Sequence, residues 1–165
     1  MKNARNSRRA LTDTQSSSFL AILGLGNEFN GDDAAGVCVA RALQERVSAP
    51  SRVLIIEAGL APENFTATLR RFHPELVIMV DAVDMGEVPG SIACLSWREG
   101  EGWSGSTHTL PPNVLAKFLI HELGCWVMLL AIQVSQTAFD TPLSAPVRKA
   151  VETVVRELSG WINEQ

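Results

Sequence analysis

The hydrophobic positions of the chain alternate between short continuous apolar runs and longer stretches in which apolar residues recur every three or four positions. The continuous runs are typical of buried strands and predict strands at residues 19–24, 53–56, 76–80, 91–97 and 126–133. The recurrent pattern predicts helices over residues 32–47 and 65–72, from residue 111 and from residue 145. This alternation predicts an α/β fold, a three-layer αβα sandwich with a five-stranded, mostly parallel sheet.

The predicted strand at residues 91–97 differs from the others, because only a glycine- and proline-containing turn separates it from the strand at 76–80. That connection is too short for the crossover that a parallel pair requires. We therefore expect this strand to be antiparallel or to lie at an edge of the sheet.

The composition fits one domain of ordinary size. The chain has 165 residues, of which 46% are hydrophobic and 19% are charged, and this supplies enough apolar material for a buried core. Residues 1–18 carry a net charge of +3 and the remainder carries −7. We expect a flexible N-terminal tail over 1–18 and a domain over 19–165. An acidic domain argues against a general nucleic-acid binder, because neutralising phosphate groups requires a basic face.

Cysteine usage and the N-terminal segment bear on location. The three cysteines are far apart and form no CxxC pair, which favours reduced thiols in the cytoplasm. Residues 7–9 resemble a twin-arginine export signal, but a polar segment follows them and the next apolar run is only as long as a strand. No apolar run approaches the ~18 residues of a membrane span. We therefore expect a cytoplasmic protein that does not bind membranes.

Candidate chemistry lies in the segments that follow the predicted strands, because ligands of parallel α/β sheets bind at the carboxyl ends of the strands. Three of these segments contain carboxylates and the fourth contains a histidine; they are residues 24–33, 57–59, 81–84 and 104–108. The first is not a dinucleotide fingerprint, because Phe29 stands where GxGxxG needs its third glycine, and two adjacent aspartates would repel phosphate. There is also no GxSxG elbow for nucleophilic catalysis.

Asp33, Asp81 and His108 form a candidate metal site. Two carboxylates and one imidazole suit a borderline divalent ion such as zinc or nickel, and three ligands leave positions open for substrate or water. Asp33 would begin the first helix, where the helix dipole favours the ionised form that a ligand needs. Asp32 is most simply the N-cap of that helix. The residues alone leave a second interpretation open, in which Asp81 and His108 are ordinary loop residues.

Four loop segments resemble the signatures of the nickel–iron hydrogenase maturation endopeptidases, in the order in which that family has them. They are GLGN at 24–27 with GDDAAG at 31–36, EAGLAPEN at 57–64, VDAVDMG at 80–86 with PG at 89–90, and STHTLP at 106–111. The similarity covers residues 19–162 and is greatest to the branch called hydrogenase 3 maturation endopeptidase. The chain departs from the family pattern at Ala34, where glycine is common, and at Glu57, where aspartate is common.

This resemblance implies a metal-dependent, aspartyl-type endopeptidase that removes the C-terminal extension of a nickel–iron hydrogenase large-subunit precursor after nickel insertion. The nickel is carried by the precursor and serves as the recognition element, and no organic cofactor is implied. The family's metal-contacting positions correspond here to Asp33, Asp81 and His108, which are also the implied catalytic residues. Three further carboxylates would support them: Asp32, Asp84 and Glu57. The implied partner is the precursor, and we expect the protein itself to be a monomer.

Two other functions remain open at this point. A non-catalytic, nickel-dependent chaperone would bind the large subunit without cutting it. A peptidyl-tRNA hydrolase would share the GLGN opening at residues 24–27. Those enzymes need a basic RNA-binding face and a histidine soon after that loop, whereas the domain here is acidic and its first histidine is His73.

Overall fold

The computed structural model describes residues 19–48, 51–97 and 112–164. Within these ranges the elements follow the predicted order: β1 (Leu20–Leu25), α2 (Ala35–Arg46), β2 (Val53–Gly59), α3 (Thr66–Phe72), β3 (Leu76–Val83), β4 (Ile92–Trp97), α4 (Pro112–Leu123), β5 (Trp126–Gln133) and α5 (Ala145–Asn163). Short 3₁₀ turns at Gly31–Ala34 and Pro62–Phe65 precede α2 and α3. The predicted tail, residues 1–18, lies outside the described residues. None of the described helices is long and apolar enough to cross a membrane.

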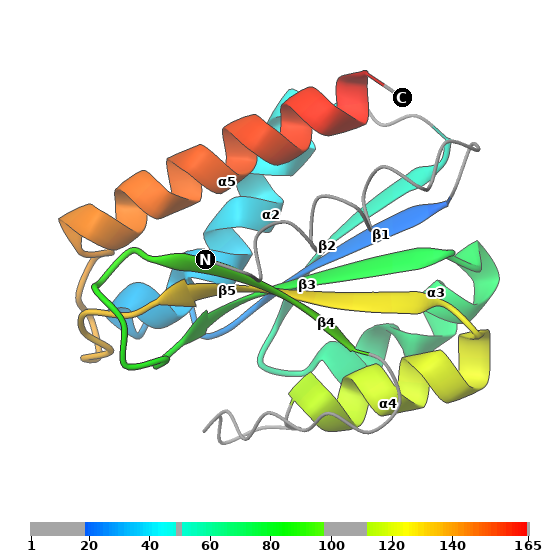
Figure 1. Cartoon of the computed structure of the whole chain (residues 1–165), viewed down its shortest axis with the longest axis horizontal. Coiled ribbons are helices and arrows are strands. Elements are labelled where there is room, and N and C mark those ends of the chain that lie inside the picture. Colours follow the sequence, from blue (N-terminus) through cyan, green and yellow to red (C-terminus); the bar gives the residue numbers. More distant parts are fainter. Residues whose placement is uncertain (1–18, 49–50, 98–111, 165) are drawn as a thin grey trace.

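The strands form one sheet in the order β2-β1-β3-β5-β4 (Figure 1). β1 pairs with β2 and β3, and β3 pairs with β5, all in parallel, whereas β4 pairs antiparallel with β5 at the edge of the sheet. The predicted mostly parallel sheet is confirmed, and so is the expectation for the strand at 91–97. The carboxyl ends of the parallel strands lie at the left of Figure 1, together with the loops that follow β3 and β5.

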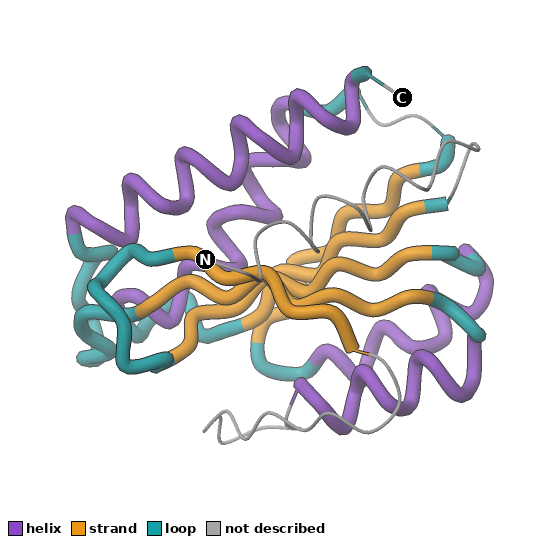
Figure 2. Tube along the Cα trace, in the orientation of Figure 1, coloured by secondary structure: helices purple, strands orange, loops and turns teal. Residues whose placement is uncertain are grey.

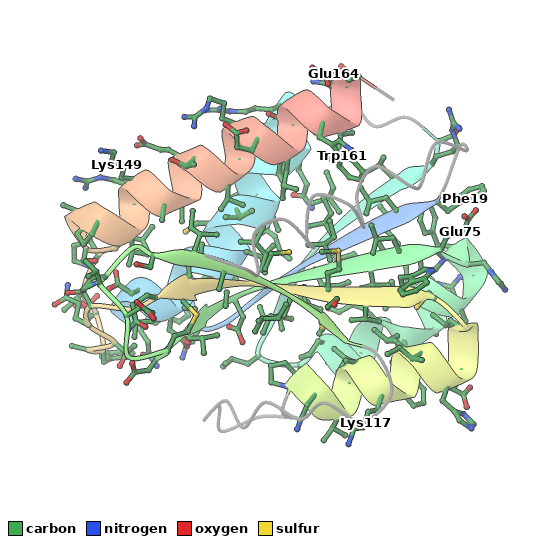
Figure 3. The ribbon with its side chains drawn as sticks, in the orientation of Figure 1. Phe19, Glu75, Lys117, Lys149, Trp161 and Glu164 are labelled. Carbon is green, nitrogen blue, oxygen red and sulfur yellow. The ribbon has the colours of Figure 1, made fainter. Side chains whose placement is uncertain are left out.

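Helices cover both faces of the sheet, with α2 and α5 on one face and α3 and α4 on the other (Figure 2). Lys149 of α5 and Lys117 of α4 lie on the outward sides of their helices (Figure 3). The apolar residues of β3 alternate between two cores: Val80 belongs to the core under α2 and α5, and Met79 to the core under α3 and α4. Because side chains alternate along a strand, Asp81 projects toward the face that α3 and α4 cover.

Glycines allow α2 to approach the sheet closely. A Cβ atom at Gly36 would lie 2.1 Å from the carbonyl oxygen of Val80 and 2.4 Å from that of Leu25. A Cβ atom at Gly24 would lie 2.2 Å from the carbonyl oxygen of Gly36. Only residues without a Cβ fit at these contacts. The contacts bring the start of α2, and the turn that holds Asp33, against the carboxyl ends of β1 and β3.

One strand boundary differs from the predicted one and concerns the site. β3 continues to Val83 rather than ending at residue 80, because Asp81 pairs with Ala131 and the ladder with β5 extends to Gln133. Asp81 is therefore a strand residue. The simpler sequence interpretation, in which Asp81 is a loop residue, is wrong. Backbone pairing with β5 outweighs the low strand preference of aspartate at this position.

The direction of β4 also changes one part of the predicted site. Because β4 is antiparallel, its last residue, Trp97, pairs with Val127 near the start of β5. β4 therefore ends at the edge of the sheet opposite the carboxyl ends of the parallel strands. The strand order alone had suggested that the segment after β4 begins at those carboxyl ends.

Candidate active site

Asp33 and Asp81 come together at the carboxyl edge of the sheet. β1 and β3 are parallel neighbours with Gly24 paired to Val80, so the residues after β1 lie beside Asp81. Asp33 stands in the 3₁₀ turn Gly31–Ala34, which contacts β3. Burial raises the pKa of the Asp81 carboxyl, and the charge of Asp33 raises it further, as expected for neighbouring acids. The fold thus joins two of the three residues that the sequence proposed.

Asp81 is a buried acid that lacks a full set of partners. The residue is 2% exposed, and its buried Oδ1 atom has no hydrogen-bond partner among the residues that the structure describes. Burial, and after it the charge of Asp33, raises the pKa of Asp81 to about 7, against the opposing effect of the Ala82 amide. An ionised carboxylate in such surroundings is costly unless it is paired. The site therefore favours a proton or a cation next to this oxygen.

Asp33 is only partly buried, and one of its oxygens is held by the loop that follows β1. Its Oδ2 accepts a hydrogen bond from the backbone N–H of Asn27 at 2.9 Å. The side-chain Oδ1 of Asn27 in turn accepts one from the N–H of Phe29 at 3.0 Å. Burial raises the pKa of Asp33, and the Asn27 amide counteracts that rise. The loop therefore orients the Asp33 carboxylate.

Asp32 has a different role from the predicted one. The N-cap of the 3₁₀ turn is Asn30, and no side chain caps α2, so the prediction that Asp32 caps the first helix is wrong. Its fully buried carboxylate instead accepts hydrogen bonds from the N–H groups of Ser135, Gln136 and Ser144 at 2.8, 2.9 and 2.6 Å, and from the Ser144 hydroxyl at 2.9 Å. Burial by itself would raise the pKa of Asp32, but these bonds outweigh it and hold the pKa below its usual range. Asp32 fastens the loop after β5 to the start of α2.

Gln133 orders the loop between β3 and β4. It is 4% exposed and ends β5. Its Oε1 accepts hydrogen bonds from the N–H groups of Met85 and Glu87 at 2.6 and 3.2 Å, and its Nε2 donates to Oδ1 of Asp84 at 3.1 Å. This last bond, with one from the Gly86 amide, lowers the pKa of Asp84. Sequence reasoning gave Gln133 no role; the available signal was a polar residue ending an apolar strand at this edge.

Arg41 of α2 is a further residue that sequence reasoning missed. Its Nη2 lies 2.7 Å from Oε2 of Glu57 and 3.1 Å from Oε2 of Glu28, and its Nε donates to Glu57 at 3.0 Å. These exposed ion pairs stabilise the fold little. Their effect is local: Glu57, proposed as a supporting carboxylate, is neutralised by Arg41. No local pattern links residue 41 to residue 57, so only the fold reveals this pairing.

His108 lies outside the described residues, and its role stays a prediction. Within the described ranges, no group of three or more His, Cys, Asp or Glu side chains is arranged to hold a metal ion. Asp33 and Asp81 supply two suitable side chains, so the predicted ligand set depends on a residue whose position is not described.

The fold and the site together define a class of protein. It is a three-layer α/β protein in which two coupled carboxylates at the carboxyl edge of a mostly parallel sheet can share a proton or bind a cation. Comparison with known proteins gives the family: the model for hydrogenase maturation protease matches residues 37–161.

Individual relatives agree with the family match. The hydrogenase 3 maturation protease of Escherichia coli strain K12 is 36% identical over 142 residues, which is 85% of this chain and 88% of that protein. A putative hydrogenase maturation protease of Methanocaldococcus jannaschii is 30% identical over 88% of this chain and 89% of its own length. The crystal structure of the [NiFe] hydrogenase maturation protease HycI of Thermococcus kodakarensis superposes with a TM-score of 0.83 at 30% identity, and the match covers 93% of this chain and 99% of that one.

The chain belongs to the hydrogenase maturation protease family and is an endopeptidase. The α/β fold class and the resemblance drawn from the four loop segments are thereby confirmed. Membership of this family also excludes the peptidyl-tRNA hydrolase interpretation.

Proposed function

We propose that this protein removes the C-terminal extension from the large-subunit precursor of a nickel–iron hydrogenase, in the cytoplasm, after nickel has entered the precursor. Its relatives are named for the maturation of hydrogenase 3 in E. coli and of a [NiFe] hydrogenase in T. kodakarensis, which supports this class of substrate. Free thiols at Cys38, Cys94 and Cys125 suit a reducing compartment.

The observation that carries the proposal is the buried, unpartnered oxygen of Asp81 beside Asp33. In this proposal the nickel of the precursor is part of the substrate and supplies the positive charge that the two carboxylates lack. A divalent ion of borderline softness accepts both carboxylate and imidazole ligands. Asp33, Asp81 and His108 would thus contact the nickel, and a precursor without nickel would meet two carboxylates and no counter-charge.

The placement of α4 supports His108 as the third contact. α4 packs on the face to which Asp81 projects, and it ends at Leu123, shortly before β5 begins. A helix of 12 residues rises about 18 Å, so α4 begins part of the way toward the carboxyl edge (Figure 1). His108 precedes Pro112 by four residues, a separation that spans at most about 14 Å. The length of α4 and the reach of the four residues before it are therefore compatible with a contact between His108 and Asp81.

The same carboxylates can assist peptide hydrolysis. Water adds to the scissile carbonyl carbon, the carbon–nitrogen bond breaks, and the departing amine takes up a proton. A carboxylate that contacts the nickel is ionised, so it can accept a proton from the attacking water and return that proton to the departing amine. Contact with the nickel would hold the precursor in one orientation while this occurs.

Mass spectrometry of the precursor after incubation with the purified, full-length protein tests the proposal. The nickel-loaded precursor should lose the mass of its extension, and the nickel-free precursor should keep it. Equal cleavage of both would refute the role of nickel. Binding of the loaded precursor without any loss of mass would identify a non-catalytic chaperone instead.

Variants assign the residues. Asp33→Ala, Asp81→Ala and His108→Ala should each slow cleavage by at least ~10²-fold in proteins whose circular dichroism matches the wild type. Glu75→Ala is the matched control, because it removes an exposed carboxylate at the opposite edge of the sheet (Figure 3), and it should leave the rate unchanged. Cleavage at the wild-type rate by any of the three variants would refute the role of that residue.

A further inference from the structure

Exposed apolar side chains gather at the edge of the sheet that carries the acid pair. Among the described residues, eight large hydrophobic side chains are exposed. Five of them stand in loops or at a strand end at this edge: Phe29, Leu60, Val88, Ile92 and Phe139. Scattered exposed apolar residues need no explanation, but a concentration around a site indicates an interaction surface.

Phe29 and Phe139 are neighbours although they come from different loops. The N–H of Asp140 donates to the carbonyl oxygen of Phe29 at 2.7 Å, and Asn30 forms a parallel bridge with Thr141. Standard backbone geometry then places the two phenylalanine Cα atoms within about 8 Å of each other. The side chains are 59% and 76% exposed. We call Phe29 and Phe139 the phenyl pair.

The backbone beneath the phenyl pair is ordered by hydrogen bonds to the acids of the site. Asn27 donates to the Asp33 carboxylate through its N–H and accepts from Phe29 through its side chain. The buried Asp32 carboxylate binds the loop that leads from β5 to α5, in which Phe139 lies. Aromatic side chains on a pre-ordered backbone lose little conformational entropy on binding, so they make effective anchors.

Charges around the phenyl pair indicate the chemistry of its partner. Glu28 immediately precedes Phe29 and shares Arg41 with Glu57, so these three side chains carry one net negative charge. Asp140 immediately follows Phe139 and adds a second. A complementary surface is therefore apolar at its centre and carries lysine or arginine at its rim. A second copy of this chain suits the position poorly, because the two acidic rims would face each other.

We propose that the phenyl pair is an exosite that docks the folded body of the large-subunit precursor through an apolar patch flanked by basic side chains. The identity of this partner rests on the proposed function. Phe29 and Asp33 belong to one hydrogen-bonded loop, and Phe139 is joined to that loop by the bond between Asp140 and Phe29. A protein seated on the phenyl pair therefore lies beside the acid pair as well. In this arrangement the exosite supplies affinity and the acids supply contact with the nickel and with the scissile bond.

The test separates binding from cleavage. Kd for immobilised nickel-loaded precursor and kcat at saturating precursor are measured for the full-length wild type, for Phe29→Ala and for Phe139→Ala. Each variant should weaken binding about tenfold and leave kcat within about twofold. Trp126→Ala, which removes an exposed aromatic side chain from the opposite edge, should change neither quantity.

Four outcomes decide the proposal. Unchanged Kd in both phenylalanine variants, with normal cleavage by the wild type, overturns the exosite and leaves the proposed function intact. Weakened binding in a system where even the wild type does not cleave supports the exosite and refutes the proposed function. A wild-type dimer in sedimentation equilibrium that either variant dissociates assigns the pair to self-association and overturns the proposal. The proposal is also overturned if removal of residues 1–18 tightens precursor binding in the wild type but not in Phe139→Ala. The chain's own basic tail is then the occupant of the phenyl pair.

Discussion

Replacing Asp81 by asparagine tests the electrostatics of the site through the stability of the fold. Asp81→Asn keeps the shape of the side chain but cannot ionise. In the wild type, burial and the charge of Asp33 raise the pKa of Asp81 from 3.8 to about 7. The folded state therefore binds this proton more tightly than the unfolded state does. The contribution of the protonated Asp81 side chain to the free energy of unfolding is complete below pH 3.8 and is lost as the pH rises toward 7.

The size of the effect follows from the two pKa values. The gap between 3.8 and about 7, at about 1.36 kcal/mol for each pKa unit, corresponds to about 4 kcal/mol. Between pH 4 and pH 8, the free energy of unfolding of the wild type should fall by about 3–4 kcal/mol relative to Asp81→Asn. The unpaired N–H group of the new amide has a cost of its own, but that cost is independent of pH and cancels when the difference is followed across the pH range.

Urea unfolding of both proteins from pH 4 to pH 8 measures this difference. Asp33→Asn, which removes the neighbouring charge, should lower the pKa of Asp81. The fall in the free energy of unfolding between pH 4 and pH 8 should then be smaller. Asp84→Asn is a control of opposite sign, because hydrogen bonds to Gln133 and Gly86 lower the pKa of Asp84, so its contribution to stability is lost as the pH falls. If the difference in the free energy of unfolding between the wild type and Asp81→Asn stays constant from pH 4 to pH 8, burial does not raise the pKa of Asp81 and this explanation is wrong.

Two further predictions concern the scaffold. Gly36→Ala should destabilise the protein by about 3 kcal/mol or more, because the added Cβ would lie 2.1 Å from the carbonyl oxygen of Val80. Gly160→Ala in α5 should stabilise the protein by ~0.5–1 kcal/mol, because an added Cβ there would meet nothing within 4 Å apart from the backbone of its own helix. Thermal denaturation measures the stability of the two variants. If both substitutions stabilise or both destabilise the protein, the close packing of α2 on the sheet does not explain the effect of Gly36→Ala. Asp32→Ala removes four hydrogen bonds to a buried carboxylate and should cost about 3 kcal/mol. Amide hydrogen exchange should then rise at Ser135 and Ser144, and unchanged protection would show that Asp32 does not hold this loop.

Hydrophobic periodicity predicted the regular elements because residues that face a core recur with the period of their own element. β5 and the start of α5 lie at the residues expected. The end of β3 was placed too early, because Asp81 interrupts an apolar run and one polar residue inside a strand has the same local pattern as the first residue of a loop. The ladder with β5, which lies far away in the chain, decides between the two.

By itself the sequence determined the fold class, the family, and the meeting of the acids after β1 and in β3, since parallel neighbours bring their carboxyl ends to one edge of a sheet. Only the tertiary structure decided what each acid does there. Asp32 and Asp33 are adjacent in the chain, yet Asp32 is fully paired with the loop before α5, whereas Asp33 stands beside Asp81, whose Oδ1 has no partner among the described residues. The proton affinity and the pairing of a carboxylate depend on the groups that surround it in space, and for these acids most of those groups lie far away along the chain.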